Sequence, residues 1–126
     1  MNLATLTALS TLCVSLLCPT AMAQQKQTPP IVLMQAIDHD LVAEVRADGD
    51  YLGVLVLAFE ADEAKLLPGL PPLLLHGIVA AYGLSAAGQL TFMLPTKGLH
   101  SVLVHGQALL FGSELRATPS TELVIP

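Results

Sequence analysis

Residues 41–59 decide the fold of this chain, and they read Leu-Val-Ala-Glu-Val-Arg-Ala-Asp-Gly-Asp-Tyr-Leu-Gly-Val-Leu-Val-Leu-Ala-Phe. In residues 41–46 the side chains of Leu41, Ala43 and Val45 share one face. This period of two is typical of a half-buried antiparallel strand. Residues 51–59 are apolar on both faces, which indicates a central strand covered on both sides. The second cover could be the Pro-rich residues 66–72 or another molecule.

Turn residues separate these strands from others along the chain. Asp48-Gly49-Asp50 predicts a tight hairpin turn between residues 41–47 and 51–59. Further alternating segments predict strands at 90–94, 102–110 and 121–125. The apolar run 73–81 has the length of a buried strand, and residues 61–67 predict one short helical turn. About seven strands at this spacing predict an all-β, antiparallel β-sandwich, with a small closed β-barrel as the alternative.

Composition limits the classes of protein to which the chain can belong. Its 126 residues are 53% apolar and 12% charged, with ten acidic residues against five basic ones. Length and composition exclude a two-domain protein, a disordered tail and a basic nucleic-acid binder. We therefore expect one small acidic domain and no nucleic-acid partner.

The N-terminus has the pattern of an export signal. Residues 1–23 carry no charged side chain, and the small residues Ala21 and Ala23 fit a signal-peptidase cleavage site. Residues 24–30 then form a flexible lead-in to a domain at 31–126. Cleavage after Ala23 removes Cys13 and Cys18, so the mature domain is disulfide-free and secreted or periplasmic. The alternative is an uncleaved membrane anchor.

Charge is distributed unevenly over the rest of the chain. Eight of the ten acidic residues lie between Asp38 and Glu63, whereas no charged residue occurs between Lys65 and Lys97. Prolines and glycines interrupt that uncharged stretch, so we expect no membrane span in the mature chain. Ca²⁺ takes several carboxylate oxygens as ligands, and the candidate ligands are Asp38, Asp40, Asp48 and Asp50. One strand separates the two pairs, however, and solvated turn residues are the alternative.

Residue patterns for catalysis have little support in the sequence. Glu60, Asp62 and Glu63 could supply a carboxylate pair, but their polar segment between apolar stretches favours a solvated turn. The sequence contains no Gly-x-Ser-x-Gly motif and no Gly-rich phosphate loop, and the mature chain has no thiol. His100 and His105 are five residues apart, so on one strand they point to opposite faces and do not share a metal. The sequence therefore predicts a protein that is not an enzyme and has no cofactor, with a small hydrolase as the less favoured alternative.

The second half of the chain resembles a known family. Leu94-Pro95, Gly98-Leu99 and Gly106-Gln107-Ala108 precede a terminal strand at 120–125. In this order residues 51–126 resemble a β-rich domain common at the C-termini of exported, uncharacterised proteins of planctomycete-type bacteria. His105 departs from the family pattern, which has an aromatic residue there. The resemblance implies export and a β-sandwich-like module with a structural or binding role.

Together these patterns predict an exported, non-catalytic β-sandwich with a structural or protein-interaction role in the cell envelope or outside the cell. Its partner would be another envelope or extracellular protein, or a second copy, held by the apolar strand 51–59 and the loop at 66–75. The alternative is a ligand-binding module that takes Ca²⁺ at the acidic loops or a glycan. Sugar-binding sandwiches usually present flat aromatic platforms, and Tyr51 and Tyr82 are the candidates for that role.

Overall fold

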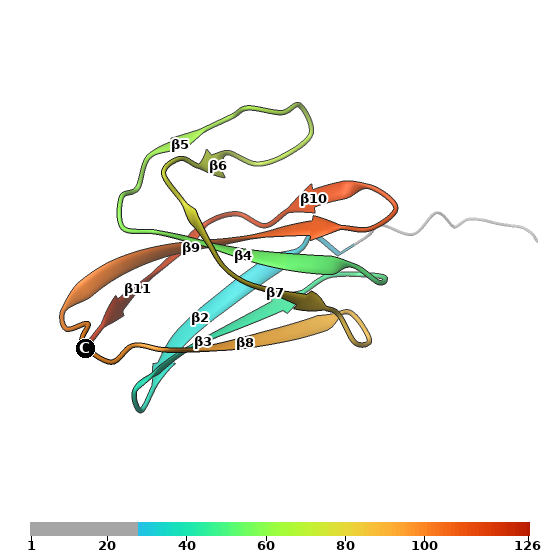
Figure 1. Ribbon diagram of the computed structural model, residues 1–126. Helices are drawn as coiled ribbons and strands as arrows, with labels where there is room; N and C mark the ends of the chain where they lie inside the picture. The colour runs from blue at the N-terminus through green and yellow to red at the C-terminus, as the bar shows by residue number, and fades with distance from the viewer. Residues whose placement is uncertain (1–27) are drawn as a thin grey trace, which may run out of the picture.

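The computed structural model describes residues 28–126, and this part of the chain is all-β and antiparallel (Figure 1). Seven strands have five or more residues, and three are shorter. They are β2 (Ile31–Ile37), β3 (Asp40–Arg46), β4 (Leu52–Ala58), β5 (Glu63–Ala64), β6 (Leu73–Leu74), β7 (Ile78–Leu84), β8 (Gln89–Pro95), β9 (Val102–Phe111), β10 (Leu115–Ala117) and β11 (Thr121–Ile125). The predicted signal at 1–23 and most of the lead-in lie outside the described residues.

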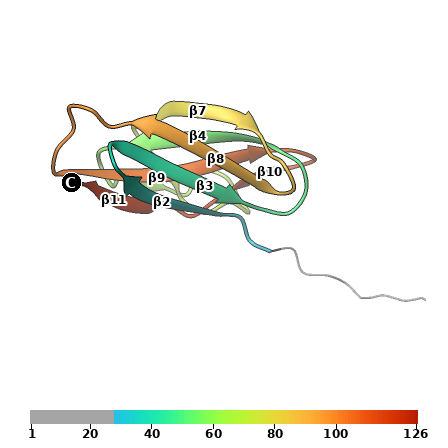
Figure 2. The ribbon, with the colours of Figure 1, turned by 90° about the horizontal axis from the view of Figure 1, so that it is seen from below.

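Two sheets form the predicted sandwich. One has the order β2-β3-β8, and the other has the order β10-β9-β4-β7 with β11 also paired to β9. In Figure 2 the strands of the first sheet cross those of the second in two layers. The sheets are not joined into a closed barrel, so the sandwich prediction is confirmed. No helix in residues 28–126 is long and apolar enough to cross a membrane.

Side chains of the first sheet alternate between its two faces, and one of these faces lines the core. Val45 lies opposite Val32 on one side and Leu90 on the other, and Ala43 lies between Met34 and Phe92. These rows face the second sheet, where the largest fully buried side chains include Leu55, Leu110 and Val104. Residues 28–126 contain no cysteine, so the core is closed by apolar packing without a disulfide.

The predicted hairpin at Asp48-Gly49-Asp50 is wrong. β3 pairs with β2 and β8, whereas β4 pairs with β7 and β9, so the turn carries the chain from one sheet to the other. Gly49 has the positive φ of 81° that the turn residues indicate. Turn chemistry therefore fixes a change of direction, but it does not determine whether the flanking strands pair.

Tyr51 holds this crossing in place from inside the sandwich. Its backbone N–H donates to the Ser85 hydroxyl at 3.0 Å, and its own hydroxyl donates to the carbonyl oxygen of Gly88 at 3.0 Å. The same hydroxyl lies 3.3 Å from the carbonyl oxygen of Val45. Burial raises the pKa of the Tyr51 phenol, and the nearby Arg116 opposes that shift.

We expect Tyr51→Phe to lower the free energy of unfolding at pH 7 by about 1–2 kcal/mol, because the hydrogen bonds that the hydroxyl donates inside the sandwich are lost. The raised pKa means that the folded state binds the phenolic proton more tightly than the unfolded state. The wild-type protein should therefore lose stability as the pH rises above about 10. The Tyr51→Phe variant should lose less stability over that pH range, because it lacks the phenol that titrates. Urea unfolding at pH 7 to 11 measures both effects, and parallel pH profiles would contradict the second one.

Residues 59–76 form a cover over the outer face of the second sheet, on the side away from the first sheet (Figure 1). The predicted helical turn at 61–67 is wrong, because Glu63 and Ala64 pair with Leu74 and Leu73 as β5 and β6. The predicted strand at 73–81 is wrong as well. A turn at 75–77 divides it, and Ile78 and Val79 beyond the turn are exposed.

Gln107 binds this cover to the sheet. Its amide oxygen accepts from the N–H of Leu74 at 2.9 Å, and its amide nitrogen donates to the carbonyl of Pro72 at 2.8 Å. The nitrogen also donates to the carbonyl of Thr118 at 2.9 Å. The side chain is fully buried, with 1% of the residue exposed. The apolar outer face of β4 near Val56 is thus covered from within the chain, as one of the two sequence alternatives predicts.

Candidate functional site

The four aspartates of the Ca²⁺ hypothesis do not come together. Asp38 and Asp40 lie at the β2–β3 turn, whereas Asp48 and Asp50 follow the other end of β3. A strand of seven residues separates the pairs by roughly 20 Å. Asp48 is engaged within the fold, since its carboxylate accepts from the Thr28 N–H at 2.7 Å. The structure therefore gives these carboxylates no common point for an ion.

A different group of possible ligands lies in the cover. Within residues 28–126, one imidazole nitrogen of His76 and one carboxylate oxygen each of Glu60 and Asp62 lie within 4.8 Å of one another. Pairing of β5 with β6 joins the two segments, and Leu75 N–H donates to the Asp62 carbonyl at 2.8 Å. All three side chains are exposed. The donor types suit Zn²⁺, but ordering three solvated side chains opposes binding.

Sequence reasoning missed this group for a physical reason. The polar segment that contains Glu60 and Asp62 is typical of a solvated turn, and both side chains are exposed. His76 is far from them along the chain, so no ligand spacing indicates the three together. Their meeting depends on the two-residue ladder of β5 and β6, which no alternation in the sequence reveals.

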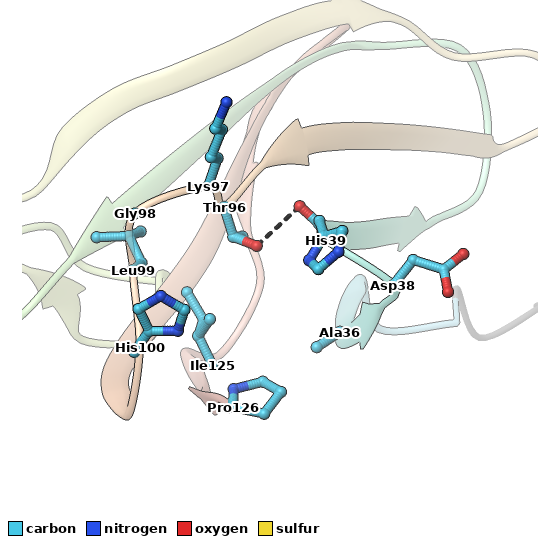
Figure 3. Close-up of a pocket in the computed structure, with 10 residues that line it drawn as sticks. All are labelled: Ala36, Asp38, His39, Thr96, Lys97, Gly98, Leu99, His100, Ile125 and Pro126. Carbon is cyan, nitrogen blue, oxygen red and sulfur yellow. Dashed lines mark hydrogen bonds between the residues drawn. The ribbon is translucent and has the colours of Figure 1, made fainter.

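A pocket of about 620 Å³ lies at one end of the sandwich, between the β2–β3 turn, the β8–β9 loop and the end of β11 (Figure 3). Its lining combines the imidazoles of His39 and His100 with apolar Leu99 and Ile125. Figure 3 shows the Lys97 amine directed away from these side chains. The hydroxyl of Thr96 donates to the His39 carbonyl at 2.8 Å. Among these lining residues the hydroxyl is thus engaged with backbone, and no nucleophile faces a general base.

The two aromatic residues named for a glycan surface have different environments. Tyr51 is 3% exposed and its ring lies within the core. Tyr82 on β7 is 75% exposed. A flat sugar platform made of both rings is therefore not formed, and Tyr82 belongs instead to a larger apolar surface.

That surface, here named the outer-face strip, crosses the second sheet beside the cover. Its first row joins four directly opposed residues on neighbouring strands, namely Leu84, Leu52, Phe111 and Leu115. All four are exposed, and Leu84 at 76% is the most exposed of them. The second row on the same face is Tyr82, Val54 and Leu109. The strip contains no charged side chain, so seven apolar residues from four strands form one uncharged surface.

The strip ends at an edge of the sandwich that is also uncharged. β7 and β8 are the last strands of their sheets on this side, and the turn at 85–88 joins them. They lie close together at Gly83 of β7 and Leu90 of β8. The Leu90 side chain is 3.2 Å from the position that a Cβ would occupy at Gly83. Both strands belong to the uncharged stretch between Lys65 and Lys97. The edge at which the strip ends is therefore formed by two strands without a charged side chain.

Comparison of the chain with models of known protein families, with curated proteins and with solved structures finds no match. The resemblance of residues 51–126 to the domain of exported bacterial proteins thus stays a prediction.

Proposed function

We propose that the protein is a non-catalytic interaction module of the cell envelope or the extracellular space, and that the outer-face strip is its contact surface. The strip supports this proposal, because its exposed apolar area is on the order of several hundred Å², the range in which patches mark contact sites. Isolated apolar residues on a surface need no such explanation. Here the register of four strands aligns them in rows.

The shape of the strip favours a protein partner over a small ligand. Small ligands are held in concave sites, whereas the strip lies on the open face of a sheet. The pocket at the sandwich end is formed by other residues. Aromatic side chains such as those of Tyr82 and Phe111 are enriched at the centres of protein interfaces. The extracellular or envelope location is proposed from residues 1–23, which lie outside the described residues.

Site-specific photo-crosslinking tests the contact surface. A benzophenone amino acid in place of Tyr82, in cells producing the full chain, should give a protein adduct of defined mass. The matched control is the same substitution at Val124, which is 59% exposed on β11. We expect the Tyr82 position to give at least about ten times more adduct, because only the strip is buried against a partner. Equal yields at the two positions, or no adduct at position 82, would refute the proposed surface.

A further inference from the structure

β7 presents an open strand edge next to the outer-face strip. Within residues 28–126 it pairs with β4 and with no second strand, so its outer side lacks a ladder partner. Natural edge strands are commonly protected by charged residues or proline. β7 has the sequence Ile-Val-Ala-Ala-Tyr-Gly-Leu and carries neither. A bulge can also protect a strand edge, and the register shift opposite Leu55 and Val56 is of this kind. It is confined to the first half of β7, which leaves residues 81–84 as a regular pairing edge.

The hydrogen bonds to β4 determine which backbone groups point outward. The N–H of Ser85 donates to the carbonyl of Tyr51 at 3.0 Å, so residue 85 belongs to a hydrogen-bonded pair. Pairs alternate along an antiparallel ladder, so Gly83 and Ala81 also bond to β4. The N–H and C=O groups of Tyr82 and Leu84 therefore point to the free side. These two residues also carry the most exposed apolar side chains of the strip.

We infer that a second copy of this chain occupies this edge, with β7 paired antiparallel to β7 of the partner about a two-fold axis at Gly83. In this register Tyr82 lies opposite Leu84 of the partner subunit, and Leu84 lies opposite Tyr82 of the partner subunit. The two pairs form four backbone hydrogen bonds from the groups that point outward. They also bring the two large apolar side chains together on the outer face. This inference rests on the proposed function, because it names the partner of the same surface.

Two features of the edge favour a second copy as the occupant. The central pair would be Gly83 with its symmetry mate, and non-hydrogen-bonded pairs are the closest in a ladder, so the absence of a side chain permits close approach. Charge is the second feature. The chain has a net charge of −5, and like charges would repel two copies over most of their surface. At β7 and β8 two copies meet without bringing any carboxylate into the contact, because these strands are uncharged.

Solution mass and amide exchange of the full chain test this inference together. Sedimentation from about 1 µM to about 500 µM should show a monomer–dimer equilibrium, with the micromolar dissociation constant typical of a small interface. Dimer formation should slow hydrogen exchange at the amides of Tyr82 and Leu84. The amides of Ala81 and Gly83 should be protected at both concentrations, because they already bond to β4.

The matched variants are Tyr82→Lys and Val124→Lys, both at exposed strand positions. Tyr82→Lys should raise the dimer dissociation constant at least 100-fold, because it places a charge in the apolar contact of both copies. Val124→Lys should leave it within about 2-fold. Circular dichroism confirms that each variant is folded.

Two results would overturn the inference: a monomer at the highest concentration, or a dimer in which Tyr82 and Leu84 exchange as fast as in the monomer. The photo-crosslink at position 82 separates this failure from failure of the proposed function. A monomeric protein that still forms an adduct with a different protein in cells retains the contact surface and excludes the second copy. A monomer that gives no adduct would contradict both the proposed contact surface and the second copy as its partner.

Discussion

Gln107→Ala is expected to lower the free energy of unfolding by about 3–4 kcal/mol. The substitution leaves the buried Leu74 N–H and the carbonyls of Pro72 and Thr118 without their side-chain partner. An unsatisfied buried polar group costs about 1–3 kcal/mol, and the removed side chain also leaves a cavity. Urea unfolding with a fixed slope measures the loss. The cover should loosen first, so amides at residues 62–75 should exchange faster than those in β4.

Gln89→Ala is the matched control, because Gln89 is exposed and its side chain makes none of these bonds. Its effect should stay within about 0.5 kcal/mol, as is usual for surface positions. A loss below about 1 kcal/mol for Gln107→Ala would mean that the cover is not held by this amide. Unchanged exchange in the cover would lead to the same conclusion.

Gly88→Ala is expected to destabilise the fold by about 3 kcal/mol or more. Gly88 has a φ of 81°, and a Cβ there would lie 2.4 Å from the carbonyl oxygen of Ala47. The obstruction is backbone, so it cannot be relieved by a side-chain rotation. Gly88 also accepts hydrogen bonds from the Ala47 N–H and the Tyr51 hydroxyl, so a shift here disturbs the crossing between the sheets.

Gly49→Ala separates the two causes of this effect. Gly49 has the same φ of 81°, but a Cβ there would meet nothing within 4 Å. Only the strain of the left-handed backbone applies, and we expect a loss of about 1–2 kcal/mol. The difference between the variants in thermal or urea unfolding measures the steric part. Equal losses would show that the contact with Ala47 relaxes freely.

Long strands with one buried face were predictable from the sequence. Alternation places Leu41, Ala43 and Val45 on one face, and the structure buries that face against the second sheet. The period of two depends only on backbone geometry, so it can be recognised in the sequence without knowing which strands pair. The predicted strand at 121–125 has the observed bounds for the same reason.

Strand pairing and surface exposure were not predictable in the same way. Asp48-Gly49-Asp50 specifies a turn, but the pairing of β3 with β8 and of β4 with β9 depends on residues far along the chain. The apolar run 73–81 resembles a buried strand, whereas Leu75-His76-Gly77 turns the chain. Gly77 fits there because a Cβ would be 2.4 Å from the Val56 side chain.

The sequence could predict that residues 51–59 have a second apolar contact, but it could not predict which residues form the candidate surface. The apolar character of both faces of 51–59 indicates a second contact, and half of that face is covered by residues 59–76. Only register reveals that Leu84, Leu52 and Phe111 form one row. The Ca²⁺ hypothesis grouped aspartates that are near in sequence, but an intervening extended strand keeps such groups apart.

The pairing of distant segments also governs how this chain reaches its folded state. Leu52 pairs with Phe111, and Asp40 pairs with Pro95. Neither sheet can therefore form completely before residues far along the chain have been synthesised. Domains dominated by such non-local contacts fold in milliseconds to seconds. During that interval the uncharged residues 66–96 have no cover, and apolar strands in this state are prone to aggregate. The carboxylates at 38–63 belong to the same unfolded chain, and the repulsion between such charges on different copies opposes this aggregation.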